Sequence, residues 1–256
     1  MLRVLLEKKS VQFRTFLRER IRSIVDWSRG HPVRALLYGL CLILALEYLS
    51  LPNIRLQELE KVNPHRTALM KQREREASEA GKPFHEQQQW VPLNRISPHL
   101  AHAVIVSEDG TFYENGGVDW YEVEESIEKN LEEGKASRGA STISQQLAKN
   151  LFLSTSKDPL RKLKELVITL RMERALSKER ILEIYLNVIE WGNGVFGAEA
   201  AAKKYFGKSA STITREEAAR LAAVIPSPLR HQPNQPSQYV ERRASLILER
   251  MTARGY

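Results

Sequence analysis

The longest stretch of the chain with almost no charge limits its architecture more than any other feature. Between Arg34 and Arg55 lie 20 residues, mostly apolar, in which Glu47 is the single charged side chain. A helix rises about 1.5 Å per residue, so this stretch corresponds to about 30 Å of helix, the thickness of a bilayer core. We therefore predict a membrane-spanning helix over residues 35–52. Because a carboxylate deep in a bilayer is costly, we expect Glu47 to lie near the interface.

Most of the positive charge lies ahead of this segment. Residues 1–34 hold nine Lys and Arg against three Asp and Glu, which is +6 of the +8 carried by the whole chain. Basic flanks of a membrane helix stay in the cytoplasm, so residues 1–34 are predicted to be a cytoplasmic arm. The chain would cross the cytoplasmic (inner) membrane once, with the residues after about 52 in the periplasm. Those residues are close to neutral, which argues against nucleic acid as a partner.

Other interpretations of the apolar segment are weaker. A cleavable signal peptide fits poorly, because the basic arm is long and no Ala-x-Ala site follows. A buried core helix would suit a 12-residue apolar run and stays open. A nucleic-acid-binding arm would not need the apolar run. The lone Cys41 excludes an internal disulfide framework, and no Cys/His cluster has the spacing of a zinc site.

The rest of the chain is expected to be a polar linker followed by an all-α (predominantly helical) domain. Residues 53–89 are polar and mixed in charge, with a helix-forming run over 71–80, and we expect a solvated spacer. Residues 90–256 show almost no period-two alternation. Boundary signals predict helices from 98 into the 100s, over 119–133, over 141–152, from 158 onward, over 178–190, from 214 to before Pro226, and over 239–251.

Two segments carry candidate catalytic groups. Glu108 and Asp109 follow the apolar run 103–106 where a helix meets a glycine-containing loop, a position suited to a general base in a cleft. Acids solvated at a helix end are the ordinary alternative. Downstream, a Gly/Ser/Thr-rich turn opens a helix on which Gln146, Lys149 and Asn150 share one face, suited to a phosphate or a sugar. An ordinary capped helix with a polar face is the alternative there.

The helix that begins near residue 158 carries two patterns. At 100° per residue its apolar positions form one stripe, which we predict to be the core face: Leu163, Leu166, Val167 and Leu170. Arg161 and Glu165 fall on the opposite face, and periodicity alone makes them a solvent-exposed ion pair. The helix that follows, over 181–187, is predicted to be mostly buried.

Several common motifs are absent from the sequence. It contains no Walker P-loop, no GxGxxG opening a helix, no HExxH and no GxSxG. Residues 154–157 match the SxxK pattern of penicillin-binding transpeptidases, but no SxN or KTG partner follows, so we treat this as a chance match.

Taken in order, the segments resemble glycosyltransferase family 51, the peptidoglycan glycosyltransferases. The resemblance covers roughly Trp90 to the C-terminus, ends where a bifunctional relative would continue into a transpeptidase domain, and is similar to the monofunctional branch. A match of five motifs in order is far more specific than any one of them. The matching positions are Glu108-Asp109-x-x-Phe112 with Gly117 and Asp119, Gly139–Gln146 with Lys149 and Asn150, Arg161-Lys162-x-x-Glu165, Ile181–Asn187, and Gly197–Gly207 with Glu217 and Leu221.

This resemblance implies a fold and a reaction. The expected fold is a lysozyme-like glycosyltransferase domain over 90–256. The expected reaction is glycan-chain polymerisation from lipid II, in which the GlcNAc 4-hydroxyl of lipid II attacks the lipid-linked growing chain with inversion and polyprenyl diphosphate leaves. A lysozyme-like lytic enzyme that cleaves glycan, and a catalytically inactive membrane-tethered cell-wall scaffold, are the alternatives.

The resemblance also implies roles for particular residues. Glu108 would be the base, and Glu165 would act at the diphosphate site, where it is also a weak candidate ligand for a divalent cation (Mg²⁺ or Mn²⁺). No organic cofactor is implied. The implied substrate-binding residues are Asp109, Phe112, Ser141, Thr142, Gln145, Gln146, Lys149, Asn150, Arg161 and Lys162.

The implied partners are lipid II, the nascent glycan strand and the membrane, together with penicillin-binding proteins and division or elongation proteins. Two positions depart from the family pattern: Asn115 stands where His is usual, and Ala140 where a second Gly is usual. The region between the first two motifs faces the membrane in the family. Here residues 120–134 hold six glutamates, so we do not expect deep insertion into anionic lipid.

Overall fold

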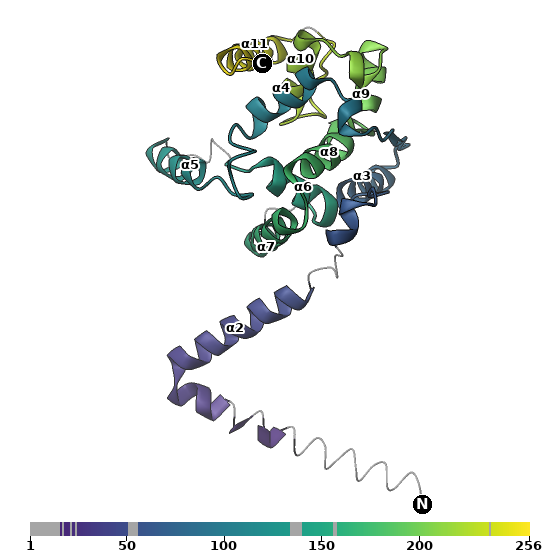
Figure 1. Ribbon diagram of the computed structural model, residues 1–256. Helices are drawn as coiled ribbons and strands as arrows, with labels where there is room; N and C mark the ends of the chain where they lie inside the picture. The colour runs from purple at the N-terminus through teal and green to yellow at the C-terminus, as the bar shows by residue number, and fades with distance from the viewer. Residues whose placement is uncertain are drawn as a thin grey trace, which may run out of the picture. The chain divides into compact units, whose positions relative to one another are not determined.

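The computed structural model describes residues 16, 18–20, 22–23, 25–50, 56–133, 140–155, 158–235 and 237–256 (Figure 1). Most of the predicted cytoplasmic arm therefore lies outside the described residues. The chain divides into two compact units, Met1–Pro52 and Asn53–Tyr256. The first contains helix α2, Pro32–Ser50. Within the described residues, no helix combines the length and the apolar character that a membrane crossing requires.

The second unit is predominantly helical, as predicted. Its α-helices are α3 (Ala68–Glu79), α4 (Pro98–Glu108), α5 (Trp120–Glu133), α6 (Ile143–Phe152), α7 (Pro159–Ala175), α8 (Lys178–Val188), α9 (Ala198–Phe206), α10 (Arg215–Val224) and α11 (Gln238–Ala253). Short 3₁₀ helices lie at Leu56–Glu60, Leu93–Arg95 and Ala210–Thr212. The helices form two groups in contact: α4 with α10 and α11, and α6 with α3, α7 and α8. The end of α4 and the start of α6 lie where these groups meet.

Residues 53–89 are part of this unit, and the prediction of a solvated spacer was wrong. Leu69 and Met70 of α3 are buried, and α3 packs against α6. On the same helix Arg73 forms a bidentate ion pair with the buried Glu190, with Nη2 to Oε2 at 2.8 Å. The mixed charge of the segment favoured the prediction of a spacer. Charged side chains such as Arg73 pair instead with other residues of the unit.

A small three-stranded sheet ties this segment to the rest of the unit. β1 (Gln87–Gln88) pairs in parallel with β3 (Val195–Phe196), which pairs antiparallel with β2 (Glu190–Gly192). The helix predicted over 178–190 therefore ends early, at Val188, and Glu190 begins β2. Strands of two or three residues are too short to show alternation, which explains why the pattern did not indicate them.

Helix α7 presents a different face to the core from the one predicted. Leu163 and Leu170 are 38% and 37% exposed, whereas the buried residues of α7 are Glu165, Ile168, Thr169 and Met172. These four also recur at helical spacing, so periodicity alone offered two candidate faces. The choice of face depends on Glu165, because a carboxylate is buried only when partners offset its desolvation.

Helix α5 projects away from the other helices of the unit (Figure 1). It begins at Trp120 after Asp119, whose Oδ1 accepts a hydrogen bond from the Glu122 backbone N–H at 3.0 Å. Its large apolar residues are exposed: Trp120, Tyr121, Ile127 and Leu131. The helix ends at Glu133, as predicted, and residues 134–139 lie outside the described residues.

Candidate active site

Glu108 lies at the C-terminal end of α4 and is held by two hydrogen bonds. Ser107 Oγ donates to its Oε1 at 3.0 Å, and Gln146 Nε2 donates to its Oε2 at 3.0 Å. Tyr185 O–H donates to Gln146 Oε1 at 2.9 Å, which turns the NH₂ end of that amide toward Glu108. Burial, followed by the charges of Glu108 and Asp109, raises the pKa of Tyr185 well above its ordinary value, so its hydroxyl stays a donor.

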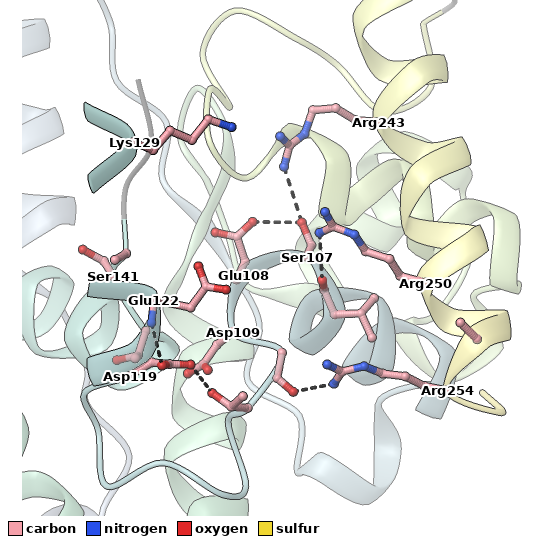
Figure 2. Close-up of a pocket in the computed structure, with 16 residues that line it drawn as sticks. Ser107, Glu108, Asp109, Asp119, Glu122, Lys129, Ser141, Arg243, Arg250 and Arg254 are labelled. Atoms are coloured by element: carbon pink, nitrogen blue, oxygen red, sulfur yellow. Dashed lines mark hydrogen bonds between the residues drawn. The ribbon is translucent and has the colours of Figure 1, made fainter. Parts of the chain in front are cut away.

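A cavity of about 730 Å³ opens beside Glu108 (Figure 2). Its wall combines residues from the end of α4 and the following loop, from α5, from the turn before α6 and from α11. Glu108 lies centrally in Figure 2, with Ser141 on one side and Arg243, Arg250 and Arg254, from α11 and its C-cap, on the other. A half-buried carboxylate held by two donors and facing a cavity can accept a proton from a bound hydroxyl.

Asp109 is buried beside Glu108 and supports the start of α6. Its Oδ2 accepts a hydrogen bond from the Ile143 backbone N–H at 3.0 Å, and its Oδ1 accepts one from Asn115 Nδ2 at 2.8 Å. Burial raises the pKa of Asp109, while these two bonds and the charge of Lys178 oppose that rise. An acid at a helix N-terminus also complements the helix dipole, so Asp109 positions α6 relative to Glu108.

Asn115, which departs from the family pattern, has hydrogen-bond partners at both ends of its amide. Nδ2 donates to Asp109 and also to Thr111 Oγ1 at 3.2 Å, and Oδ1 accepts from the Gly117 backbone N–H at 2.9 Å. An amide offers a donor and an acceptor without titrating near neutral pH. The departure therefore leaves Asp109 supported.

Thr142 caps the N-terminus of α6, so the helix begins at Ile143, two residues after the predicted start at 141. Thr142 Oγ1 accepts from the Gln145 N–H at 3.2 Å, while Gln145 Oε1 accepts from the Thr142 N–H at 3.1 Å, a reciprocal capping box. Thr142 Oγ1 also donates to the Gly117 carbonyl at 2.6 Å. Ser141 Oγ instead accepts a hydrogen bond from Lys162 Nζ at 3.1 Å.

Glu165 forms the centre of a charged cluster and is not a solvent-exposed partner of Arg161. Its side chain is 3% exposed, and its Oε2 lies 2.6 Å from Arg161 Nη1 while its Oε1 accepts from Lys162 Nζ at 2.5 Å. The periodicity-based prediction was wrong, because these two cations offset the cost of burying the carboxylate. Glu165 thus fixes two cationic side chains at one edge of the site.

Lys149 lies within electrostatic range of both Glu108 and Glu165. Burial lowers the pKa of Lys149, while the charge of Glu165 raises it, Arg161 and Lys162 lower it, and Glu108 raises it. Among the described residues its ammonium group forms no hydrogen bond or ion pair. A desolvated cation between further cations is suited to an anionic ligand, whose charge would offset the repulsion.

Other residues predicted to bind substrate are buried within the fold. Phe112 has no exposed surface, and Lys178 Nζ lies 4.6 Å from the centre of its ring, so its role is to pack under the loop that follows Glu108. Thr142, Gln145 and Asn150 are also buried. Of the ten predicted binding residues, Ser141, Gln146, Lys149, Arg161 and Lys162 keep side-chain surface that a ligand could reach.

The residues present do not fit a protein-held metal ion. No group of three or more His, Cys, Asp or Glu able to hold a metal occurs within the described parts of the chain. Glu165, the predicted candidate ligand, directs both oxygens at cations. A divalent ion would meet that positive charge rather than an open carboxylate.

Several site residues were not singled out from the sequence. Ser107 and Tyr185 hold Glu108 and Gln146, and Arg243, Arg250 and Arg254 line the cavity. The spacing of the three arginines, seven and then four residues, puts them on one face of a helix and could have indicated a shared surface.

Comparison with known proteins identifies the family of the chain. The profile of the family described as Transglycosylase matches residues 74–252, which include Glu108, Lys149 and Glu165. The chain belongs to the transglycosylase family.

Several relatives have the same name. A biosynthetic peptidoglycan transglycosylase of Nitrosospira multiformis is 50% identical over 191 residues, which cover 75% of this chain and 83% of that protein. The protein of the same name from Dechloromonas aromatica is 48% identical over 192 residues, covering 75% and 83%. That of Methylobacillus flagellatus is 55% identical over 163 residues, covering 64% and 71%.

Proposed function

We propose that this chain is a peptidoglycan glycosyltransferase that polymerises glycan from lipid II. The observation that carries the proposal is the placement of Lys149, which interacts electrostatically with both Glu108 and Glu165. A base and a cationic anion site would thereby act side by side. The family and the shared name of its relatives support the same reaction.

In the proposed reaction Glu108 is the general base. Its carboxylate accepts the proton of the acceptor's GlcNAc 4-hydroxyl as that oxygen bonds to the anomeric carbon of the growing chain. The bond from that carbon to the diphosphate oxygen breaks, and polyprenyl diphosphate leaves with the electron pair. Attack from the face opposite the leaving group inverts the α-linkage to β, so one base suffices without a covalent intermediate.

Ser107 and Gln146 keep Glu108 ready for this step. Both donate to its carboxylate, which favours the ionised form and fixes the direction of its free lone pairs. The Gln146 amide is held in turn by Tyr185. Asp109 has a supporting role in the proposal, because its carboxylate orients the N-terminus of α6.

The leaving diphosphate would be held by Lys149, Arg161 and Lys162. These cations offset the charge that develops on the leaving oxygen, and Glu165 keeps two of them in place. Ser141, next to Lys162, would orient the donor. A divalent cation stays a prediction; it would arrive with the diphosphate, and no step above depends on it.

We also propose that the segment over 35–52 anchors the enzyme in the inner membrane with its catalytic domain in the periplasm. The 19-residue helix α2, the apolar composition around it and the basic residues that precede it support this. A lipid-linked substrate requires a site near a membrane. The lysozyme-like architecture and an association with penicillin-binding or division proteins belong to the same proposal.

The reaction can be tested with the full chain in detergent. Incubation with lipid II should lengthen glycan chains, and incubation with purified sacculi should leave their chains intact. Shortening of sacculus chains without polymerisation would favour the lytic alternative. The absence of turnover on both substrates would favour a scaffold.

A further inference from the structure

Lys178 does not line the cavity, and no step of the proposed reaction uses it. It is the first residue of α8 and follows the cap Ser177. A cation at this position opposes the partial positive charge of a helix N-terminus, so the stability of α8 does not explain the lysine. Its side chain is only 18% exposed. Partners from other elements therefore hold its ammonium group.

Three side chains from two other segments surround that ammonium group. Lys178 Nζ lies 2.8 Å from Glu173 Oε1 on α7, and it donates to Asn115 Oδ1 at 3.4 Å. It also lies 4.6 Å from the centre of the Phe112 ring. Asn115 and Phe112 belong to the loop that follows Glu108. One cation thus joins α7 and α8 to the loop next to the proposed base.

Glu173 extends this link to α6. Ser144 Oγ donates to the same Oε1 that pairs with Lys178, and Ser144 is buried in the first turn of α6. Gly117 packs against Glu173, because its φ is +92° and a Cβ there would lie 2.7 Å from Glu173 Cγ. The start of α6 and the loop therefore meet on one glutamate, whose charge Lys178 offsets.

Asp109 joins the same two segments next to Glu108. Its carboxylate accepts from Asn115 on the loop and from the Ile143 N–H at the start of α6. An ionised carboxylate is an acceptor at both oxygens, whereas a protonated one has a donor at one of them. The link between the loop and α6 consequently depends on the charge of Asp109.

The Asp109 carboxylate is faced by charged and titratable groups from several elements. Lys178 on α8 lowers the pKa of Asp109, and Asp119 on the loop before α5 raises it. Tyr185 on α8 interacts with it and stays neutral, Glu108 precedes it in the chain, and α6 contributes a backbone N–H. The positive charge of Lys178 therefore opposes the negative charge of Asp119 at this point.

We propose that Lys178 is a positioning residue for the general base. Through Glu173 and Asn115 it holds the loop after Glu108 against the start of α6. Helix α6 carries Gln146, which donates to Glu108, so a shift of α6 changes the hydrogen bonding of the base. The proposal rests on the proposed function, because positioning of a base is measured through the reaction it performs.

Steady-state kinetics of the full chain with lipid II test this role. Lys178→Gln removes the charge and keeps a donor. We expect kcat to fall about tenfold with KM nearly unchanged, because the base is displaced while no substrate contact is lost. The acid limb of the pH profile of kcat should move to higher pH, because Asp109 loses a charge that favours its ionised form. Lys178→Arg should recover most of both effects.

Lys208→Gln is the matched control. Lys208 lies 2.8 Å from Glu217, is partly buried like Lys178 and lies outside the cavity. Its substitution should change neither kcat nor the acid limb. Equal effects in the two variants would overturn the proposal, since they would follow from the loss of any such ion pair. Unchanged kcat and acid limb in Lys178→Gln would overturn it as well.

A double variant separates action through Asp109 from a general loss of packing. In an Asp109→Asn background, Lys178→Gln should leave the acid limb where it is, because the titrating group is absent. A shift of the same size in both backgrounds would contradict the proposal. If Lys178→Gln does not fold, Ser144→Ala removes a donor to Glu173 from the other end of the link. It should lower kcat severalfold, and an unchanged kcat would count against the link.

Amide hydrogen exchange tests the link without using the reaction. The Ile143 N–H should exchange about tenfold faster in Lys178→Gln than in wild type, and at the wild-type rate in Lys208→Gln. Unchanged exchange in Lys178→Gln would overturn the inference. A wild-type enzyme that shows this link but does not polymerise lipid II would instead contradict the proposed function.

Discussion

The hydroxyl of Tyr185 donates to Gln146 Oε1 at 2.9 Å, and this bond decides which end of the amide faces Glu108. With Oε1 occupied, the NH₂ group is the end that contacts Glu108 Oε2, at 3.0 Å. A tyrosine on α8 thereby controls the hydrogen bonding of an acid at the end of α4.

Removing that hydroxyl should slow the reaction without unfolding the protein. In Tyr185→Phe the ring still fills its buried site, but Gln146 can turn its oxygen toward Glu108. We expect kcat to fall about tenfold with little change in KM, and the free energy of unfolding to fall by about 1 kcal/mol. Steady-state kinetics with lipid II and urea unfolding measure both. An unchanged kcat would show that Tyr185 has no positioning role.

The charged cluster on α7 should be necessary for turnover. Glu165→Gln keeps the shape of the side chain but removes the charge that fixes Arg161 and Lys162. We expect kcat/KM for lipid II to fall at least a hundredfold, because two cations lose their shared partner. Glu183→Gln on α8, which removes the partner of Arg180 outside the cavity, is a control for loss of a partly buried ion pair. Near-normal rates in Glu165→Gln would reduce the cluster to a structural role.

Lys149 should set the alkaline limit of activity. Burial lowers its pKa below the ordinary 10.5, so a rising pH neutralises it earlier than an exposed lysine. A pH profile of kcat/KM should therefore fall on the alkaline side, and in Lys149→Arg that fall should move to higher pH or disappear, because arginine stays charged. An identical alkaline limb in both proteins would mean that another group controls it.

Asp109 should make a pH-dependent contribution to stability. Its pKa is raised by burial, so just above 3.8 the unfolded state has lost the proton while the folded state keeps it. The folded state then binds more protons, and this contribution to stability falls as pH rises through that window. Asp109→Asn removes the titration, so its stability relative to wild type should improve with rising pH. Urea unfolding at several pH values tests this, and a constant difference would contradict it.

The sequence predicted helices well where a residue type marks an end. Asp158 and Thr214 cap α7 and α10 as expected, because a side-chain oxygen facing free N–H groups depends on local geometry alone. The motif order likewise predicted the family. A helix cap is a local signal and the order of motifs is a cumulative one. Neither depends on tertiary packing.

Other features depend on long-range contacts and were missed for that reason. Glu165 is buried because Arg161 and Lys162 offset its charge, and periodicity counts a glutamate as a surface residue. The local sequence assigns Arg73 to a solvated helix, because its partner Glu190 lies 117 residues later in the chain. The burial of Phe112, and the position of α11 across the cavity from Ser141, also follow from tertiary packing that no spacing rule contains.

The central claim is that Glu108 is the base of a glycan-polymerising enzyme. The most direct test is the rate of glycan synthesis from lipid II by the full chain, compared between wild type and Glu108→Gln, with thermal unfolding to show that both are folded. The account predicts chain growth by wild type and a loss of at least a thousandfold in the variant, since the amide has no basic site for the proton. Substantial synthesis by folded Glu108→Gln would contradict it.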